Sequence, residues 1–226
     1  WKGVSSNEKN DSDAQFYNIK FTYNILNIAK KLNVKKIIIP GSISEFSEAE
    51  SAVTGNEIDS PSDLYAATKV AIRKIAYQFC KKNDLDLNWL LITSVYGIGR
   101  KDANLLNYTI TNLTNNLPVK CTPLEQKWDY IYIDDLINAL YLISEKGEKN
   151  KLYPVGSGEI HKLKYYVECI AKELNKENLV KIGALPYKNN YIDNSIVDIS
   201  GLKIIGFKVD KLFKENIKQI ISSYIM

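Results

Sequence analysis

Amphipathic helical patterns alternate with short apolar runs along this chain, and that alternation limits the fold more than any other feature of the sequence. The first clear pattern covers residues 12–32 and predicts a helix, because its apolar positions recur at steps of three or four residues. Those positions are Phe16, Ile19, Tyr23, Leu26 and Ala29. A β-branched run at 36–39 follows and ends at Pro40 and Gly41, which predicts a short strand.

The rest of the chain continues in the same order. We expect a long loop over 42–60, a helix over 63–82 that begins at the capping residues Ser62 and Asp63, and another loop over 95–100. Helices between strands predict an α/β protein, a doubly wound parallel sheet covered by helices. The other expected elements are strands at 87–93, 130–133 and 152–155, and helices at 103–116, after Asp134, at 165–174 and from about residue 210.

Composition excludes several classes of protein. No apolar run among the 226 residues approaches the ~20 residues of a membrane span, so no membrane partner is expected. The net charge of +4 is spread over scattered lysines, with Arg73 and Arg100 the only arginines, so nucleic acid is not expected as a partner. Three widely spaced cysteines and the single His161 indicate no disulfide framework and no metal site, and a cytoplasmic location is expected.

The candidate site is the group Ser42, Tyr65 and Lys69. Tyr65 and Lys69 stand four residues apart on an expected helix, so both project from one face. A free tyrosine has a pKa near 10, and a neighbouring ammonium group together with a cationic nicotinamide ring would lower it toward neutrality. Ser42 follows the end of an expected strand, where open parallel sheets bind their ligands.

The Tyr-x-x-x-Lys spacing alone carries no information here. With 15 Tyr and 28 Lys (30 basic residues minus two Arg) in 226 residues, chance gives 15 × 28 / 226, roughly two matches, and the sequence holds two. The second pair, Tyr77 and Lys81, lies in the middle and at the end of the expected helix. Only Tyr65 begins a helix downstream of a strand that leads to a serine.

With that context, the chain resembles the extended short-chain dehydrogenase/reductase family, the NAD-dependent epimerase/dehydratase group that acts on sugar nucleotides. The resemblance covers nearly the whole chain, from the family's fourth sheet strand onward, and rests on stretches that follow one another in the family's order. They are 18–26, 34–39 running into Ser42, 60–69, 94–100, 128–136 and 153–158.

The resemblance implies a Rossmann-like α/β fold and a set of roles. Tyr65 would be the acid/base, Ser42 its partner at the sugar oxygen, and Lys69 the residue that binds the cofactor ribose. The cofactor-binding residues would be Tyr65, Lys69 and Asn18, and the substrate-binding residues Ser42, Ser94, Tyr96 and Arg100. The implied cofactor is NAD or NADP, the implied substrate a sugar nucleotide, and the implied assembly a homodimer formed through helices 12–32 and 63–82.

The expected domain division places the end of a Rossmann-like domain at 1–118 and a mainly sugar-nucleotide-binding lobe, interleaved with the sheet, at 119–226. The implied reaction is epimerisation or 4-ketoreduction, between which the residues do not decide. Dehydration is disfavoured, because Ile43 and Ser44 stand where family dehydratases carry Asp-Glu. Trp128 replaces a frequent family arginine, which leaves diphosphate binding to Lys127 or Arg100.

The family's glycine-rich dinucleotide fingerprint is absent from the sequence. Gly97 and Gly156 each begin a Gly-x-Gly, but neither has a glycine three residues further on. We therefore expect roughly 60–80 family residues, about two βαβ units, to be missing before residue 1. The alternative hypothesis is a truncated, non-catalytic relic or regulatory subunit that binds without turnover.

Overall fold

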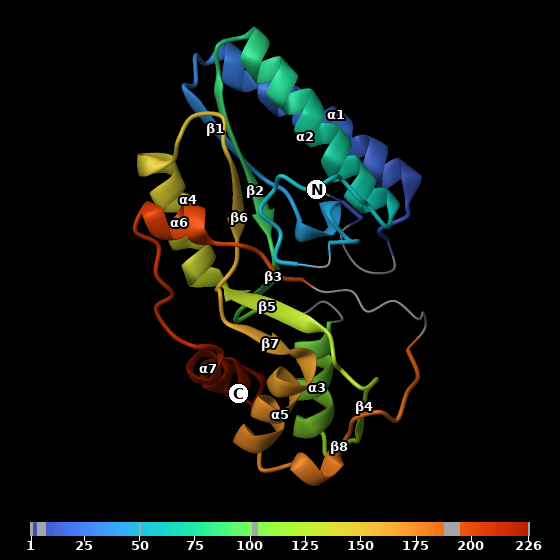
Figure 1. Ribbon diagram of the computed structural model, residues 1–226. Helices are drawn as coiled ribbons and strands as arrows, with labels where there is room; N and C mark the ends of the chain where they lie inside the picture. Colours follow the sequence, from blue (N-terminus) through green and yellow to red (C-terminus); the bar gives the residue numbers. More distant parts are fainter. Residues whose placement is uncertain (1, 4–7, 50, 101–103, 188–194, 226) are drawn as a thin grey trace.

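The computed structural model describes residues 2–3, 8–49, 51–100, 104–187 and 195–225. A parallel sheet in the order β1-β2-β6 organises the upper part of the molecule in Figure 1. Its strands are Lys36–Pro40, Asp86–Ile92 and Leu152–Val155. The expected α/β architecture is confirmed.

Helices cover both faces of this sheet. Figure 1 shows α1 and α2 side by side on one face, and α4 and α6 on the other. Their bounds are Ser12–Lys31, Leu64–Lys82, Ile133–Lys146 and Ser200–Ile204. Ala66 and Ala76 of α2 are small and fully buried, so this helix packs close to β2. This packing sets the position of the first turn of α2 relative to the strand ends.

A second layer extends from the carboxyl end of the sheet. Strand β5 (Lys127–Tyr132) pairs in parallel with β3 (Ser94–Tyr96) and antiparallel with β7 (Ile160–Lys162). Three helices pack beneath it in Figure 1: α3 (Leu105–Thr114), α5 (Leu163–Glu173) and α7 (Phe213–Ile225). The remaining short elements are β4 (Val119–Lys120), which pairs with β8 (Val180–Lys181), η1 (Ile43–Glu45) and η2 (Glu177–Leu179).

Several expected boundaries are wrong. Residues 94–96, expected partly as loop, form β3, since three residues are too few to show an alternation. The cap of α4 is Tyr132 rather than Asp134, which lies in the first turn, where its charge favours the helix dipole. Helix α3 begins after Asn104, and the expected start at 103 lies outside the described residues. Strands β4, β7 and β8 were not expected.

Two apolar cores correspond to these two layers. The larger core packs between the β1-β2-β6 sheet and its covering helices, and includes Leu26, Trp89, Tyr153 and Leu202. The smaller core lies among α3, α5 and α7. Residues on both sides of position 118 contribute to both cores, so the boundary at that position stays a prediction.

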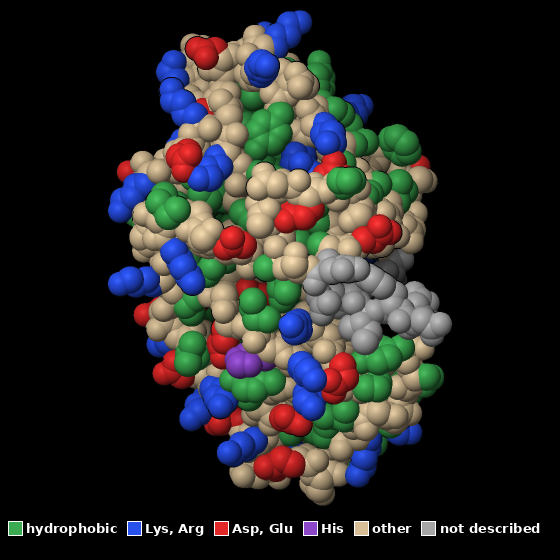
Figure 2. Space-filling model, viewed as in Figure 1, with side chains coloured by type: hydrophobic (Ala, Val, Ile, Leu, Met, Phe, Trp, Pro, Cys, Tyr) green, Lys and Arg blue, Asp and Glu red, His purple; other side chains and the backbone are tan. Residues whose placement is uncertain are grey.

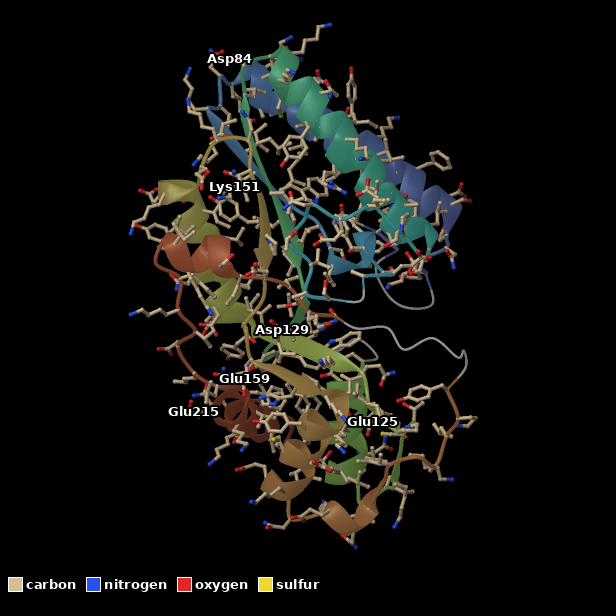
Figure 3. All side chains as sticks on the ribbon, viewed as in Figure 1. Asp84, Glu125, Asp129, Lys151, Glu159 and Glu215 are labelled. Atoms are coloured by element: carbon tan, nitrogen blue, oxygen red, sulfur yellow. The ribbon has the colours of Figure 1, made fainter. Side chains whose placement is uncertain are left out.

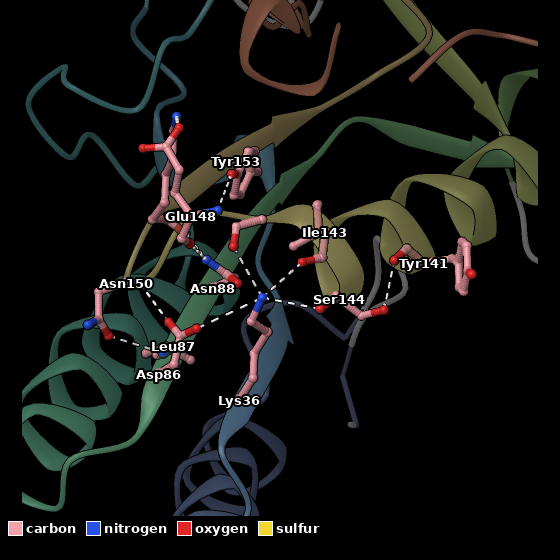
Figure 4. Close-up of polar contacts among 12 residues, drawn as sticks. Lys36, Asp86, Leu87, Asn88, Tyr141, Ile143, Ser144, Glu148, Asn150 and Tyr153 are labelled. Carbon is pink, nitrogen blue, oxygen red and sulfur yellow. Dashed lines mark hydrogen bonds and ion pairs between the residues drawn. The ribbon is translucent and has the colours of Figure 1, made fainter. Parts of the chain in front are cut away.

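Lys36 joins β1 to the end of α4. Its Nζ donates to the carbonyl oxygens of Ile143, Ser144 and Gly147, each at 3.2 Å, and lies 3.9 Å from Asp86 (Figure 4). The Ile143 carbonyl also accepts the Gly147 N–H at 2.9 Å, and Lys36 adds a cation that opposes the negative end of the helix dipole. Lys36 therefore caps the C-terminal end of α4, although it lies more than 100 residues away in the sequence.

Asp129 organises the turn between β6 and β7. This fully buried carboxylate, labelled in Figure 3, accepts the Ser157 N–H at 2.8 Å, the Ser157 hydroxyl at 2.7 Å and the Gly158 N–H at 2.9 Å. Burial raises the pKa of Asp129 above its ordinary value, while these three donors oppose the rise. The turn is thereby held against β5.

The surface carries mixed charge. On the face shown in Figure 2, lysine and arginine side chains are interspersed with acidic ones. A search of the described residues finds no helix with the length and apolar character needed to cross a membrane.

We predict that Lys36→Ala lowers the free energy of unfolding by about 1–2 kcal/mol, because three carbonyls at the end of α4 lose their cationic donor. Thermal denaturation followed by circular dichroism measures this loss. The exposed neighbour Lys35 provides the control, and Lys35→Ala leaves the melting temperature unchanged. An equal effect of the two substitutions contradicts the capping role of Lys36.

Candidate functional site

The candidate site lies where β1 and β2 end. Ser42 follows β1, and Thr93 and Ser94 follow β2, so the carboxyl ends of neighbouring parallel strands bring these hydroxyl groups together. The Gly41 N–H donates to the carbonyl oxygen of Leu90 at 2.7 Å and holds the serine loop beside β2.

The first turn of α2 supplies the other predicted residues. As expected, Asp63 caps this helix by accepting the Ala66 N–H at 2.7 Å. From this fixed start, Tyr65, Lys69 and Arg73 follow one another at steps of four residues along one face. That face turns toward β1 and the 3₁₀ turn η1, which contacts α2.

Two adjoining hollows open at this place. The Tyr–Lys hollow, of about 590 Å³, is lined by Lys9, Pro40, Gly41, Ser42, Tyr65, Lys69, Ile92, Thr93, Ser94, Val95 and Arg100. The serine hollow, of about 210 Å³, is lined by Lys9, Ser42, Ile43, Ser44, Ser47, Ser62, Ile92, Thr93, Ser94, Trp128 and Ser195. Ser42 lines both hollows, together with Lys9, Ile92, Thr93 and Ser94.

Ser42 links the phenol of Tyr65 to a second hydroxyl. Its side chain is hydrogen-bonded to Tyr65 and lies 2.8 Å, Oγ to Oγ, from Ser44. Ser42 Oγ also accepts the Ser44 N–H at 3.2 Å. When Tyr65 is neutral it can donate to Ser42, and when it is ionised Ser42 must donate to it, so the hydroxyl can serve either protonation state.

Lys69 is almost completely buried, with 4% of its surface exposed. Its Nζ donates to the carbonyl oxygen of Pro40 at 2.7 Å and lies 5.7 Å from the centre of the Tyr65 ring. Burial lowers the pKa of Lys69 to about 8, and the charge of Glu45 opposes this lowering. The amine is therefore mostly protonated at neutral pH.

Lys69 alone does not make Tyr65 acidic. Burial raises the pKa of Tyr65 above 10, and the charges of Glu45 and Asp63 add to this rise, while the hydrogen bond with Ser42 opposes it. The sequence argument relied on Lys69 and a cationic ring acting together. In the protein by itself, burial and the two carboxylates outweigh the hydrogen bond, and the pKa of Tyr65 stays above its ordinary value.

A buried carboxylate that the sequence analysis missed supports the serine loop. Glu45, fully buried, accepts the Ser42 N–H at 2.9 Å and the Trp89 indole N–H at 3.0 Å on Oε1, and the Arg73 Nε–H at 2.7 Å on Oε2. Arg73 also pairs with Asp59. The Ser-x-x-Glu spacing of a capping box was the signal available in the sequence.

The structure brings some predicted site residues together and leaves others apart. Ser42, Ser94 and Arg100 line the Tyr–Lys hollow with Tyr65 and Lys69. Asn18 lies elsewhere, fully buried, where its amide exchanges two hydrogen bonds of 2.9 Å with the backbone of Lys2. Tyr96 belongs to the smaller core, and its hydroxyl accepts a hydrogen bond from Asn216 at 3.2 Å.

Other lining residues were not anticipated as site residues. Trp128 donates its indole N–H to Ser94 Oγ at 2.9 Å and forms one wall of the serine hollow. Lys9 lines both hollows, lies 5.5 Å from the Tyr65 ring centre and pairs with Asp63 at 3.4 Å. No motif marks Lys9, and the sequence singled out Trp128 only as the replacement of a family arginine; contacts between distant segments bring both residues to the site. Among the described residues, no cluster of three or more His, Cys, Asp or Glu could hold a metal.

Comparisons with known proteins agree on one family. The profile of the NAD dependent epimerase/dehydratase family matches residues 2–156. CDP-abequose synthase of Salmonella muenchen is 30% identical over 135 residues, which are 59% of this chain and 46% of that protein. The chain spans 46% to 66% of the length of the first four curated relatives.

Solved structures show the same fold. The UDP-N-acetylglucosamine 4-epimerase from Methanobrevibacter ruminantium M1, in complex with UDP-N-acetylmuramic acid, superposes with a TM-score of 0.85 at 24% identity, over 94% of this chain and 70% of that one. DesIV, a dTDP-glucose 4,6-dehydratase from Streptomyces venezuelae with NAD and TYD bound, gives 0.84 at 16% identity, over 95% and 67%.

We predict that Gly41→Ala destabilises the protein by about 1–3 kcal/mol, because a methyl group there would lie 2.1 Å from Trp89 Nε1, 2.6 Å from Glu45 Oε1 and 2.7 Å from the Leu90 carbonyl oxygen. Thermal denaturation and near-ultraviolet circular dichroism measure the effect. Gly201→Ala is the control, because its methyl group would meet only the Tyr153 ring at 3.7 Å. Equal melting temperatures for both variants would show that the loop has room to adjust.

Proposed function

Because the chain belongs to the NAD-dependent epimerase/dehydratase family, we propose that it acts as a sugar-nucleotide 4-epimerase or 4-ketoreductase with NAD or NADP. The observation that carries this proposal is that Ser42, Tyr65 and Lys69 line one hollow, with Lys69 one helical turn beyond Tyr65 and its Nζ 5.7 Å from the centre of the Tyr65 ring. A phenol, a hydroxyl and a buried amine in this order suit proton exchange with a carbonyl or alcohol oxygen.

The lining of the Tyr–Lys hollow fits a nicotinamide nucleotide. Lys69 donates to the Pro40 carbonyl and lines this hollow, where an ammonium group suits the hydroxyls of a ribose. Ile92 and Val95 provide an apolar wall for a flat ring, and Arg100 adds a cation at the rim. Lys69 and Tyr65 are the residues that would hold the group, which when bound accepts or donates hydride.

In the proposed mechanism, Tyr65 moves a proton to or from the oxygen of the reacting sugar carbon. Ser42 stays hydrogen-bonded to the same oxygen and to the phenol, so it fixes their distance while the proton moves. Lys69 remains protonated below about pH 8 and favours the phenolate electrostatically. Lys69 is buried and Tyr65 half-buried, so both are partly shielded from bulk water, which strengthens these interactions.

The sugar portion would occupy the serine hollow. Hydroxyl groups of Ser44, Ser47 and Ser62 can donate to or accept from sugar hydroxyls, and Trp128 offers an apolar face. Ser195 and Trp128 come from 119–226, which agrees with the proposed substrate-binding lobe. Ile43 and Ser44 carry no carboxylate for water elimination, and this favours epimerisation or reduction over dehydration.

We also propose a homodimer formed through α1 and α2. Apolar side chains stand exposed along these helices: Phe16, Tyr17, Tyr23, Ile28, Leu32 and Ile75. A shallow apolar hollow of about 210 Å³ between Phe16, Ile19, Leu64 and Ala71 adds a socket for a facing side chain. Such a surface is typical of an interface between subunits.

We predict that Tyr65→Phe lowers turnover of a nucleotide-linked 4-keto sugar by about 10²–10⁴-fold, because the proton donor is lost while the ring remains. The assay follows NADH or NADPH oxidation by absorbance and epimer formation by chromatography. Net oxidation identifies a reductase, and a new epimer without net oxidation identifies an epimerase.

The second Tyr-x-x-x-Lys pair supplies the matched control. Tyr77→Phe removes a hydroxyl on the same helix that lies outside both hollows, and turnover stays unchanged. Binding of sugar nucleotide without any turnover by the unsubstituted protein would support the alternative of a regulatory relic. Unchanged turnover in Tyr65→Phe would refute the role given to the phenol.

We predict that Phe16→Glu converts the dimer to a monomer, because Phe16 is 68% exposed beside the apolar hollow of the proposed interface and a carboxylate there would have to be buried. Sedimentation velocity measures the change in mass. Leu212→Glu, at a residue 55% exposed in the other layer, leaves the dimer intact. A dimer that persists in Phe16→Glu places the interface elsewhere.

A further inference from the structure

Glu45 is buried in the 3₁₀ turn that directly follows Ser42. All of its neighbours within hydrogen-bond distance are donors: the Ser42 N–H, the Trp89 indole N–H and the Arg73 guanidinium. A protonated carboxyl would have to donate a hydrogen itself, so this arrangement suits the ionised form. Burial raises the pKa of this fully buried carboxyl, while its three donors and the charge of Arg73 oppose the rise and favour a negative charge next to the candidate site.

Stability alone does not account for such a group. A buried ion pair is often no more stable than apolar side chains of the same size, because both charges must be stripped of water. The position of Glu45 offers another account, since its three donors come from three elements: the serine loop, α2 and β2. One carboxylate therefore fixes the loop, the helix and the strand relative to one another.

The contacts of Glu45 also determine how the reacting groups are placed. On the loop side, Glu45 holds the main-chain nitrogen of Ser42, whose hydroxyl contacts Tyr65. On the helix side it holds Arg73, which lies on the same face as Tyr65 and Lys69. Glu45 thus sets the distance between the Ser42 and Tyr65 side chains, because it contacts both the serine loop and α2.

We propose that Glu45 is a positioning residue for the Ser42–Tyr65–Lys69 group, tethering the serine loop to α2 and keeping a fixed negative charge beside the phenol and the amine. This inference rests on the proposed function and deepens it. Glu45 itself contacts neither hollow, so it acts only through Ser42, Arg73 and its charge.

The charge of Glu45 shifts the pKa values of two neighbouring groups in the same direction. It raises the pKa of Lys69 and of Tyr65, and therefore favours the ammonium but disfavours the phenolate. The other charged or titratable groups around it are Arg73, Asp59 and Tyr77, and near Tyr65 also Asp63 and Lys9. Neutralising Glu45 should lower the pKa of both Tyr65 and Lys69.

The test is Glu45→Gln, which keeps an oxygen acceptor for Ser42 and removes the charge. Arg73 retains Asp59 as a partner, so this variant should fold. We expect the titration of Tyr65 to move to lower pH by about half a unit or more. The ¹³Cζ resonance of tyrosine, assigned by its loss in Tyr65→Phe, measures this titration without any need for turnover.

Asp59→Asn is the matched control. It also neutralises a carboxylate that pairs with Arg73, but Asp59 binds Nη2 rather than Nε and does not hold Ser42. It should lower the melting temperature while leaving both the Tyr65 titration and the pH profile of turnover unchanged. Equal titrations of Tyr65 in the unsubstituted protein and in Glu45→Gln overturn the proposal.

Arg73→Lys tests the tether separately, because it keeps the positive charge and loses the forked guanidinium contact. We expect kcat to fall by about tenfold or more with KM nearly unchanged, and an unchanged kcat overturns the tether. The same variant serves if Glu45→Gln does not fold. Failure of the proposed function can be told apart from failure of the role given to Glu45. If the protein is not such an enzyme, no variant shows turnover, but the Tyr65 titration still reports the effect of Glu45.

Discussion

The contact between Glu45 and Arg73 is the constraint on which the candidate site depends. The carboxylate and the guanidinium lie 2.7 Å apart in the interior, at the meeting point of β2, α2 and the loop after β1. Gly41 is part of the same arrangement, because no side chain fits between it, Trp89 and Glu45. Without this contact the strand end and the helix could each form, but the hydroxyl and the phenol would have no fixed separation.

Burial shifts the pKa values of the two reactive groups in opposite directions, raising that of Tyr65 and lowering that of Lys69. It favours the neutral amine at Lys69 and the neutral phenol at Tyr65, so the protein by itself does not favour a charged pair. Glu45 counters this at the lysine and reinforces it at the tyrosine. The site is therefore set for a neutral acid next to a retained cation, and its acidity depends on a further positive charge in the hollow.

The sequence predicted the architecture well because helical and strand periodicities are local properties. Helices α1 and α2, strand β2 and the cap at Asp63 follow from residue patterns within about twenty positions. The pair Tyr65–Lys69 and the strand-end Ser42 could be chosen for similar reasons. The Ser-x-x-Glu spacing was a local signal for Glu45, but the contacts that give Glu45, Trp128 and Lys9 their importance join distant segments and cannot be seen in the sequence. Short strands such as β3 leave too brief a pattern to detect.

The place of Ser42 in the lining of both hollows has a thermodynamic consequence. A hydroxyl has a single hydrogen to give, so a molecule that accepts it on one side changes what the residue offers on the other. A ligand in one hollow would then change the affinity of the other hollow for its own ligand, and thermodynamic linkage makes this effect mutual. Two ligands, one in each hollow, would then bind cooperatively, in part through the orientation of one O–H bond.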